Sequence, residues 1–289
     1  MPTDPFDPKP KRYLSVSQLK SYERCPHSYY LSRVKQEWQR PAAWLAQGTA
    51  VHAAIEGWER SGRQMSLQDA QALFRESYAD AANEYARLTP NFEWWFRSGP
   101  YDGERDLARR FDIGREQVAK YISWATSHPE EVIWITPDGT PAIELEFDIE
   151  LDEVQIRGYI DAVIVDHSKS TTSYDGGGEK FGKPRLVPWL RVRDHKTGNN
   201  PGDDFQLGVY SVALSEMYGL FGPYEGDYWL GRSGKPTYPF DLRNWTRNRV
   251  VEKFRELQDN IEAGRFDPLP DPDKCRFCNV AYACAYAEG

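Results

Sequence analysis

The sequence predicts a mixed α/β protein in which helices flank a central sheet. Two observations lead to this prediction. Segments with apolar residues at helical spacing occur together with shorter segments in which apolar and polar residues partly alternate, as strands require. The order is helices, several strands, helix, strand and helix, with a mostly helical stretch between the second helix and the sheet. One domain with a helical insertion is the simplest architecture for this order.

The first half of the chain is predicted to be helical. Residues 15–36 begin with two serines, which favour a helix start, and Pro26 indicates a break within this helix. Residues 43–60, "AWLAQGTAVHAAIEGWER", place small and apolar residues close to helical spacing. Residues 66–128 are predicted as further helix, interrupted by the aromatic patch "NFEWWFRSGPYDG".

The second half supplies the predicted strands. The strand patterns are "EVIWI", "AIELEFDIEL", "VQIRGYIDAVIVD", "LVPWLRVRDHK" and "GDYWLG", with a turn at Asp152–Glu153. A Gly-, Ser- and Lys-rich loop is expected over residues 167–184. Helices are predicted from Asp203 through "DFQLGVYSVALSEMYG" and over residues 243–263.

The composition is that of a globular protein without a membrane segment. Hydrophobic residues make up 40% of the chain and aromatic residues 14%, and no apolar run is as long as a membrane span requires. The N-terminus "MPTDPFDPKPKR" lacks the apolar core of a signal peptide, so we expect a cytoplasmic protein. In that compartment, cysteines are more often metal ligands or free thiols than disulfides.

The net charge of −8 argues against a uniformly basic nucleic-acid binder. The charge is uneven, however. Residues 183–196 contain five basic residues and one acid, and residues 232–255 contain seven basic residues and two acids. These two stretches are where we expect a basic groove facing a nucleic acid, although solvated charges on unrelated faces would give the same pattern.

The segment "DHKTG" carries a candidate active-site pair at the end of a predicted strand. Side chains alternate along a strand, so Asp194 and Lys196 are expected on one face and His195 on the other. In phosphodiester hydrolysis, a carboxylate holds a divalent metal while a lysine steadies or helps deprotonate the attacking water. Surface strands also carry this spacing by chance, so the pair alone does not identify an enzyme.

Asp161 lies within the otherwise apolar strand "RGYIDAVIV", where a carboxylate without a partner is costly. Beside Asp194 on an adjacent strand, it would form a pair suited to a hard cation such as Mg²⁺. A capped or edge-exposed Asp161 is the alternative. Glu144 and Glu146, on an earlier strand, could extend the acidic site.

Three helical residues are further candidates. His52, in "GTAVHAAIE", is either a ligand or a histidine paired with Glu56 one turn later. Gln206 and Tyr210 stand at i and i+4, on one helix face, where half-buried packing residues are also common.

In combination and in this order, these motifs resemble the RecB-type branch of the PD-(D/E)xK nuclease superfamily. The motifs are G-x3-H (Gly48, His52), G-x2-D (Gly158, Asp161), D-x-K (Asp194, Lys196) and Q-x3-Y (Gln206, Tyr210). The resemblance covers residues 13–286 and implies a restriction-endonuclease-like core, a mixed central sheet flanked by helices. The helical insertion and the Gly/Ser-rich loop have no specific match in it.

The cysteines extend the resemblance. "CRFCNVAYAC" places Cys275, Cys278 and Cys284 at C-x2-C-x5-C spacing, and the other cysteine is Cys25 in "YERCPHSYYL". This arrangement resembles a subgroup that includes AddB-type nuclease domains and CRISPR-associated and phage single-domain exonucleases. The resemblance implies a [4Fe–4S] cluster that staples the N- and C-terminal ends together. Zinc is the alternative, although structural zinc sites usually draw on two close cysteine pairs.

The same resemblance implies a metal-dependent mechanism. The ligands of one or two Mg²⁺ or Mn²⁺ ions would be His52, Asp161, Asp194 and the backbone carbonyl of His195. Lys196 would orient or activate the water, while Gln206 and Tyr210 would position the DNA strand or the metal-site residues. In-line attack on phosphorus would leave a 5′-phosphate and a 3′-hydroxyl.

These inferences predict a flexible arm over residues 1–12 and a single nuclease domain over residues 13–289. The predicted parts of that domain are N-terminal helices (13–60), a helical insertion (61–130), a catalytic sheet core (131–240) and a C-terminal helix with the cysteine cluster (241–289).

The predicted function is a DNA exonuclease acting on single strands or DNA ends, in repair, recombination, a phage or CRISPR adaptation. The chain lacks a G-x4-G-K-[ST] motor motif, so any unwinding would be weak or would come from a partner helicase. The alternatives are an end-processing module of a larger assembly, for example with a CRISPR integrase, and a DNA-binding protein with relic nuclease residues. Trp94, Trp95 and Phe96 could stack on single-stranded bases or fill the core of the insertion.

Overall fold

The computed structural model describes residues 13–174, 184–198 and 200–288, so the predicted arm over residues 1–12 lies outside the described residues. The chain divides into two compact units. Unit 1 comprises Met1–Glu37, Glu146–Tyr159 and Trp245–Gly289, and unit 2 comprises Trp38–Leu145 and Ile160–Asn244. Strands β2 and β3 contribute residues to both units.

The strands form one mixed, seven-stranded sheet with the order β1-β3-β4-β5-β6, in which β2 also pairs with β3 and β7 with β5. β4 and β5 run parallel and are joined by helix α6, whereas β4 is antiparallel to β3. The strands are β1 (Glu131–Ile133), β2 (Ile143–Leu151), β3 (Val154–Tyr174), β4 (Pro184–Lys196), β5 (Glu225–Leu230), β6 (Lys235–Pro236) and β7 (Phe240–Asp241). A mixed sheet flanked by helices confirms the predicted α/β class.

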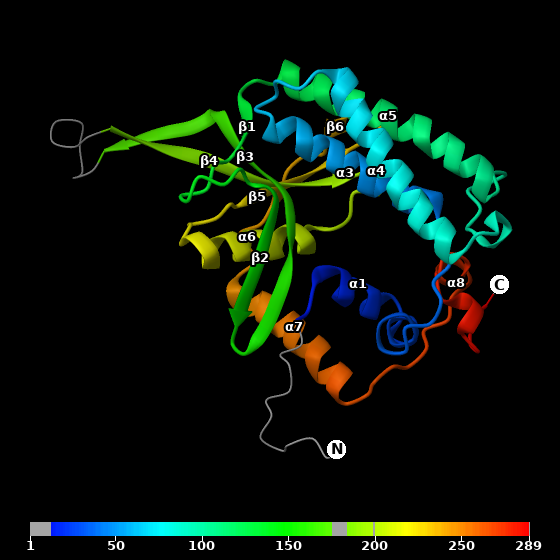
Figure 1. The fold of residues 1–289 in the computed structure, drawn as a ribbon. Coiled ribbons are helices and arrows are strands. Elements are labelled where there is room, and N and C mark those ends of the chain that lie inside the picture. The colour runs from blue at the N-terminus through cyan, green and yellow to red at the C-terminus, as the bar shows by residue number, and fades with distance from the viewer. Residues whose placement is uncertain (1–12, 175–183, 199, 289) are drawn as a thin grey trace, which may run out of the picture. The chain divides into compact units, whose positions relative to one another are not determined.

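Unit 2 carries three long helices on one side of β4 and β5 and helix α6 on the other (Figure 1). Its helices are α3 (Ala43–Arg60), the short 3-10 helix η2 (Phe92–Trp94), α4 (Leu67–Leu88), α5 (Gly103–Ser127) and α6 (Asp204–Tyr218). Ser66 and Asp102 cap α4 and α5 by accepting a backbone N–H with their side chains. Phe74, Tyr121 and Trp229 join the three long helices and the sheet in one apolar core.

Unit 1 joins the beginning and the end of the described chain. Its helices are α1 (Val16–Arg24), α2 (Pro26–Tyr29), the π-helix η1 (Tyr30–Val34), α7 (Arg247–Glu262), α8 (Pro272–Arg276) and the 3-10 helix η3 (Ala281–Ala283). Leu14 forms a parallel bridge with Ile156, and the Tyr22 hydroxyl donates to the carbonyl of Arg265. Arg24 Nη2 donates to the Lys274 carbonyl at 2.7 Å.

Most predicted elements are confirmed. Helix α3 has the predicted bounds, the first helix breaks at Pro26, and Asp152 and Glu153 form the predicted turn with φ of 47° and 72°. Positive φ at both central positions is typical of a two-residue hairpin turn. None of the helices in the described residues is both long and apolar enough to cross a membrane.

The predicted loop over residues 167–184 is wrong for the part that the structure describes. β3 continues to Tyr174 and β4 begins at Pro184, with Thr171 paired to Val187 after an irregularity that follows Asp166. The consecutive Thr171 and Thr172 favour a strand here because β-branched side chains fit a pleated surface. Residues 175–183 lie outside the described residues.

Buried ion pairs link strands β1, β3, β4 and β5. Arg193 is 2% exposed and donates to both carboxylate oxygens of Asp227, at 2.7 and 2.8 Å, and to Glu131 at 2.8 Å. Arg191 donates to Glu131 at 3.0 Å and to Asp166 at 3.2 Å. Since a buried guanidinium without its carboxylate is costly, these pairs favour the observed register of the four strands.

In the Glu131→Gln variant, the free energy of unfolding is expected to change less with pH in the acid range than it does in wild type. Burial raises the pKa of Glu131, but Arg193 and Arg191 outweigh burial and hold the pKa below its usual 4.5. The charged carboxylate therefore stabilises the fold above pH 4.5, and this contribution is lost as the pH falls through the lowered pKa.

Urea unfolding across this pH range measures the effect. The difference in unfolding free energy between wild type and Glu131→Gln should shrink towards acid pH. Glu116→Gln, at an exposed carboxylate of α5, is the control. A difference that stays constant from neutral to acid pH would contradict the prediction.

Candidate active site

The antiparallel pairing of β3 with β4 brings two aspartates together. The register pairs Ala162 with Arg193, so Asp161 and Asp194 lie opposite each other one residue further along each strand. Asp161 is 7% exposed and Asp194 1% exposed. Burial, followed by the charge of Asp194, raises the pKa of Asp161 to about 7. The sequence prediction of a buried carboxylate pair is consistent with this geometry.

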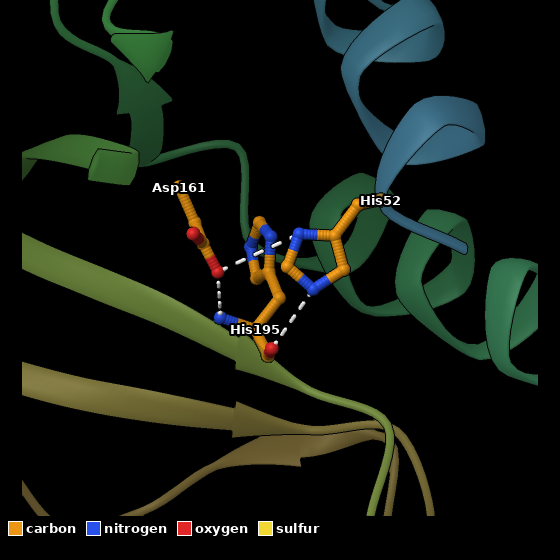
Figure 2. Close-up of side chains that lie close together, drawn as sticks. All are labelled: His52, Asp161 and His195. Atoms are coloured by element: carbon orange, nitrogen blue, oxygen red, sulfur yellow. Dashed lines mark hydrogen bonds and ion pairs between the residues drawn. The ribbon is translucent and has the colours of Figure 1, made fainter. Parts of the chain in front are cut away.

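His52 reaches Asp161 from helix α3 (Figure 2). Its Nε2 donates to the backbone carbonyl of His195 at 3.0 Å, and its Nδ1 lies 3.7 Å from Asp161 Oδ2. The backbone N–H of His195 donates to the same Asp161 oxygen at 2.7 Å. The structure therefore gathers His52, Asp161 and the His195 carbonyl, three of the four predicted metal ligands, at the end of β4.

Glu144 also belongs to this cluster. Its Oε1 accepts a hydrogen bond from His52 Nδ1 at 3.0 Å, and its backbone has a φ of 46°, in the left-handed region. The alternative partner of His52, Glu56, pairs with Arg60 at 2.7 Å instead. Glu146 is exposed. Alternation along β2 places both glutamates on one face, so the sequence makes them equal candidates for the acidic site. Only the backbone geometry distinguishes them.

His52 donates from both ring nitrogens, because a carboxylate and a carbonyl can only accept. This requires the protonated imidazolium. Burial lowers the pKa of His52, but Asp161, Glu144 and Asp194 together raise it to about 9. In the metal-free protein, the imidazolium therefore supplies positive charge among three carboxylates.

A second set of contacts holds Asp194 on the side of the sheet that faces helix α6. Lys196 Nζ lies 2.5 Å from Asp194 Oδ2, and Gln206 Nε2 donates to Asp194 Oδ1 at 2.5 Å. Gln206 also donates to the Tyr210 hydroxyl at 2.7 Å. The predicted D-x-K pair thus shares one strand face, and the predicted helix pair Gln206 and Tyr210 contacts it.

The ring of His195 takes no part in these contacts. It packs edge-on against Tyr121, with centroids 5.2 Å apart, and within the described residues neither ring nitrogen has a hydrogen-bond partner. Burial lowers the pKa of His195 well below its usual value. One ligand atom each from His52, Asp161 and His195 lie within 4.8 Å of one another, so the neutral ring is a further possible metal donor that sequence reasoning missed.

Gln117, in the predicted helical insertion, supports the end of β4. Its Nε2 donates to the Thr197 carbonyl at 3.0 Å, and its Oε1 accepts from Gln47 at 2.7 Å. A Cβ atom at Gly231 would lie 2.8 Å from the Gln117 amide, so only glycine allows this close approach. The helical insertion therefore positions the segment that follows Lys196.

The predicted basic groove over residues 183–196 is partly wrong. Arg191 and Arg193 are buried in ion pairs and cannot face a nucleic acid. They occupy the strand face opposite to Asp194, as the alternation of side chains requires. In the second stretch, Arg243 pairs with Asp241. The charge of a sequence segment does not reveal which of its arginines form ion pairs with carboxylates elsewhere in the fold.

The four cysteines line one pocket in unit 1. All four are free thiols and half-buried. The backbone N–H of Leu269 lies 3.5 Å from Cys25 Sγ, and Arg24 also lines the pocket. Burial raises the pKa of Cys278, and the Arg24 guanidinium acts against this. The isolated Cys25 is thus brought to the C-terminal three, Cys275, Cys278 and Cys284.

In the metal-free protein, Asp161→Asn is expected to raise the melting temperature at pH 8. Because the folded-state pKa of Asp161 is raised to about 7, the stability associated with its protonated form is lost as the pH rises through that value. An uncharged asparagine removes this loss. Thermal unfolding with a chelator at pH 5 and pH 8 measures it, with exposed Asp112→Asn as the control. A variant that melts below wild type at pH 8 would contradict the prediction.

Comparisons with known proteins place this geometry in a family. The chain is 50% identical over 277 residues to the Gene 69 protein of Mycobacterium phage D29, and 48% identical over 296 residues to that of phage L5; each match covers 93% of this chain and 95% of the relative. A crystal structure titled "Putative exonuclease", from Eubacterium rectale, aligns with a TM-score of 0.45 at 13% identity, over 96% of this chain and 90% of that chain. The model of the PD-(D/E)XK nuclease superfamily matches residues 13–176 and 186–285. The chain therefore belongs to the PD-(D/E)XK nuclease superfamily.

Proposed function

We propose that this protein is a metal-dependent deoxyribonuclease that hydrolyses phosphodiester bonds in single-stranded DNA or at DNA ends and leaves 5′-phosphates. The observation that supports this most directly is the meeting of Asp161, Asp194, Lys196 and His52 at one strand end, in a chain of a nuclease superfamily. Both relatives come from mycobacteriophages, which favours a role in phage infection. Because the family match runs through both units, we treat residues 13–289 as one nuclease.

The residues at this site fit a hard divalent cation. Carboxylate and carbonyl oxygens are the donors that Mg²⁺ and Mn²⁺ prefer, and imidazole is compatible with Mn²⁺. We assign the binding of Mg²⁺ or Mn²⁺ to Asp161, Asp194, the His195 carbonyl and His52. A cation bound there would lower the pKa of a water molecule and neutralise charge on the phosphate.

The remaining side chains orient the reacting groups. Gln206 holds one oxygen of Asp194 and Lys196 the other, so the carboxylate keeps one orientation. The Lys196 ammonium lies beside Asp194, and 29% of the Lys196 side chain is exposed. From this position it can hold a water molecule for in-line attack. Tyr210 fixes the Gln206 amide.

Glu144 orients His52. A metal-binding histidine usually donates its other ring N–H to a carboxylate, which fixes the tautomer and the ring plane. Glu144 Oε1 is that carboxylate for His52 Nδ1, and it leaves Nε2 directed at the His195 carbonyl. The left-handed φ of Glu144 is a strained conformation of the kind that proteins retain at functional sites.

We assign the cysteine pocket to a [4Fe–4S] cluster. All four thiols of the chain line it, and a backbone N–H points at Cys25, as second-shell donors do around cluster sulfurs. Zinc is the competing occupant, because four thiolates also suit a tetrahedral zinc site.

Lys196→Ala should lower the rate of cleavage by about 10²- to 10⁴-fold, because the alanine cannot hold or activate the water. Protein purified without oxygen is incubated with Mn²⁺ or Mg²⁺ and linear single-stranded DNA labelled at either end. Lys120→Ala, on helix α5, is the matched control. The proposal is supported if wild type and Lys120→Ala cleave DNA in the presence of metal and Lys196→Ala does not. An active Lys196→Ala protein would refute the role of this lysine.

Glu144→Gln should weaken Mn²⁺ binding by about 10- to 100-fold, because the neutral amide no longer selects the His52 tautomer. Calorimetric titration of Mn²⁺ into the DNA-free protein measures this directly. Glu146→Gln, at the exposed glutamate of the same strand, should bind Mn²⁺ as wild type does. Equal affinities in all three proteins would exclude the orienting role.

Cys25→Ser should remove the visible absorbance and the bound iron of protein purified without oxygen, and lower the melting temperature. Ser28→Ala, a change in the lining of the same pocket, should retain both. Iron and acid-labile sulfide in a 1:1 ratio support the cluster. Stoichiometric zinc in place of iron would overturn this assignment and leave the nuclease proposal intact.

A further inference from the structure

One surface of unit 2 combines exposed indole rings with guanidinium groups, and the proposed metal site does not use it. Trp94 is 48% exposed and Trp38 36% exposed, with ring centroids 6.1 Å apart and planes at 86°. Of the three aromatic residues predicted either to stack on bases or to fill the core, Trp95 and Phe96 are buried and only Trp94 is exposed. The aromatic–arginine surface consists of Trp38, Arg40, Trp94, Arg97 and Tyr101.

Hydrogen bonds hold these side chains in place. Arg40 Nε donates to the carbonyl of Trp94 at 2.8 Å, and its Nη2 donates to that of Trp95 at 3.1 Å. Trp38 Nε1 donates to Thr89 Oγ1 at 2.9 Å. The rings are therefore ordered before any ligand arrives, which reduces the entropy lost on binding.

Two guanidinium groups also lie in this surface. Burial and the nearby Arg97 lower the pKa of Arg40, so two guanidinium groups lie close enough to repel each other. Within the described part of the chain, no carboxylate forms an ion pair with either. Tyr101, 39% exposed, lies 4.7 Å from the guanidinium of Arg109. Anions are attracted to such a surface.

Helix α3 connects this surface to the candidate active site. The Trp44 ring packs 5.6 Å from Phe96, beneath the surface, and Gly48 and His52 follow Trp44 at i+4 and i+8. With a rise of 1.5 Å per residue, Trp44 and His52 are about 12 Å apart along the helix. A single strand of a few nucleotides spans that distance.

We propose that the aromatic–arginine surface binds the bases of a single DNA strand whose backbone continues to the metal site. Stacking needs unpaired bases, since the faces of bases inside a duplex are already covered, so the surface should select single strands. Arg40 and Arg97 attract the phosphates between the stacked bases. This inference rests on the proposed nuclease function for its choice of ligand.

The test measures binding of fluorescein-labelled oligo(dT) to the full-length protein in the presence of a chelator, where no cleavage occurs. Trp94→Ala should weaken binding by about 5- to 100-fold, the usual effect of losing one stacked base. Trp94→Phe should restore most of the affinity, because it restores a ring. Tyr238→Ala removes an aromatic residue that is 96% exposed elsewhere in unit 2 and should bind as wild type.

Two results would overturn the inference: Trp94→Ala binding as tightly as wild type, or Trp94→Phe binding as weakly as Trp94→Ala. A loss of equal size for duplex DNA would also overturn the preference for single strands. Cleavage is assayed separately with Mn²⁺. A protein that cuts DNA but binds it independently of Trp94 refutes only this surface, whereas one that binds through Trp94 without cutting refutes only the nuclease proposal.

Discussion

Two buried carboxylates that face each other across β3 and β4 determine what must surround them. Asp161 and Asp194 repel each other, and burial makes the repulsion costly, so the groups that contact their carboxylate oxygens directly are donors or cations. The His195 N–H and the His52 imidazolium compensate Asp161, while Gln206 and Lys196 compensate Asp194. Their helices approach from opposite sides of the sheet (Figure 1). A divalent cation would meet the same electrostatic demand more completely, which is why the arrangement suits metal binding.

The elements of this site were largely predictable from the sequence, because its motifs follow regular periods. Alternation in β4 predicts that Asp194 and Lys196 share a face, and helical spacing predicts that Gln206 and Tyr210 do so. Contacts between distant segments were not predictable in this way. The local sequence does not indicate that β2 begins beside His52. Glu144 and Glu146 were therefore equivalent candidates, and only the structure shows that Glu144 contacts His52.

The errors share one physical cause, which is that composition does not report orientation. Residues 183–196 are basic, yet the same alternation that exposes Lys196 to the site turns Arg191 and Arg193 towards buried acids. Residues 171–174 are rich in hydroxyl side chains, yet they pair with residues 184–187 in the sheet, because the backbone ladder itself needs no apolar residues. Trp94 and Trp95 are adjacent and chemically identical, but one is at the surface and the other in the core.

The composition of unit 1 has a consequence for synthesis on the ribosome. Its first strand contact, its α1 and its first cysteine all lie within residues 1–37, whereas their partners lie within residues 146–159 and 245–289. A ribosome releases these segments in order, so the N-terminal helices emerge long before the residues that complete their packing. Their apolar side chains, such as Leu19 and Tyr29, are fully covered only after residues 245–289 have been synthesised. Packing of this unit therefore cannot be completed before those residues leave the ribosome, and a chain that lacks residues 245–289 leaves the N-terminal helices without their partners.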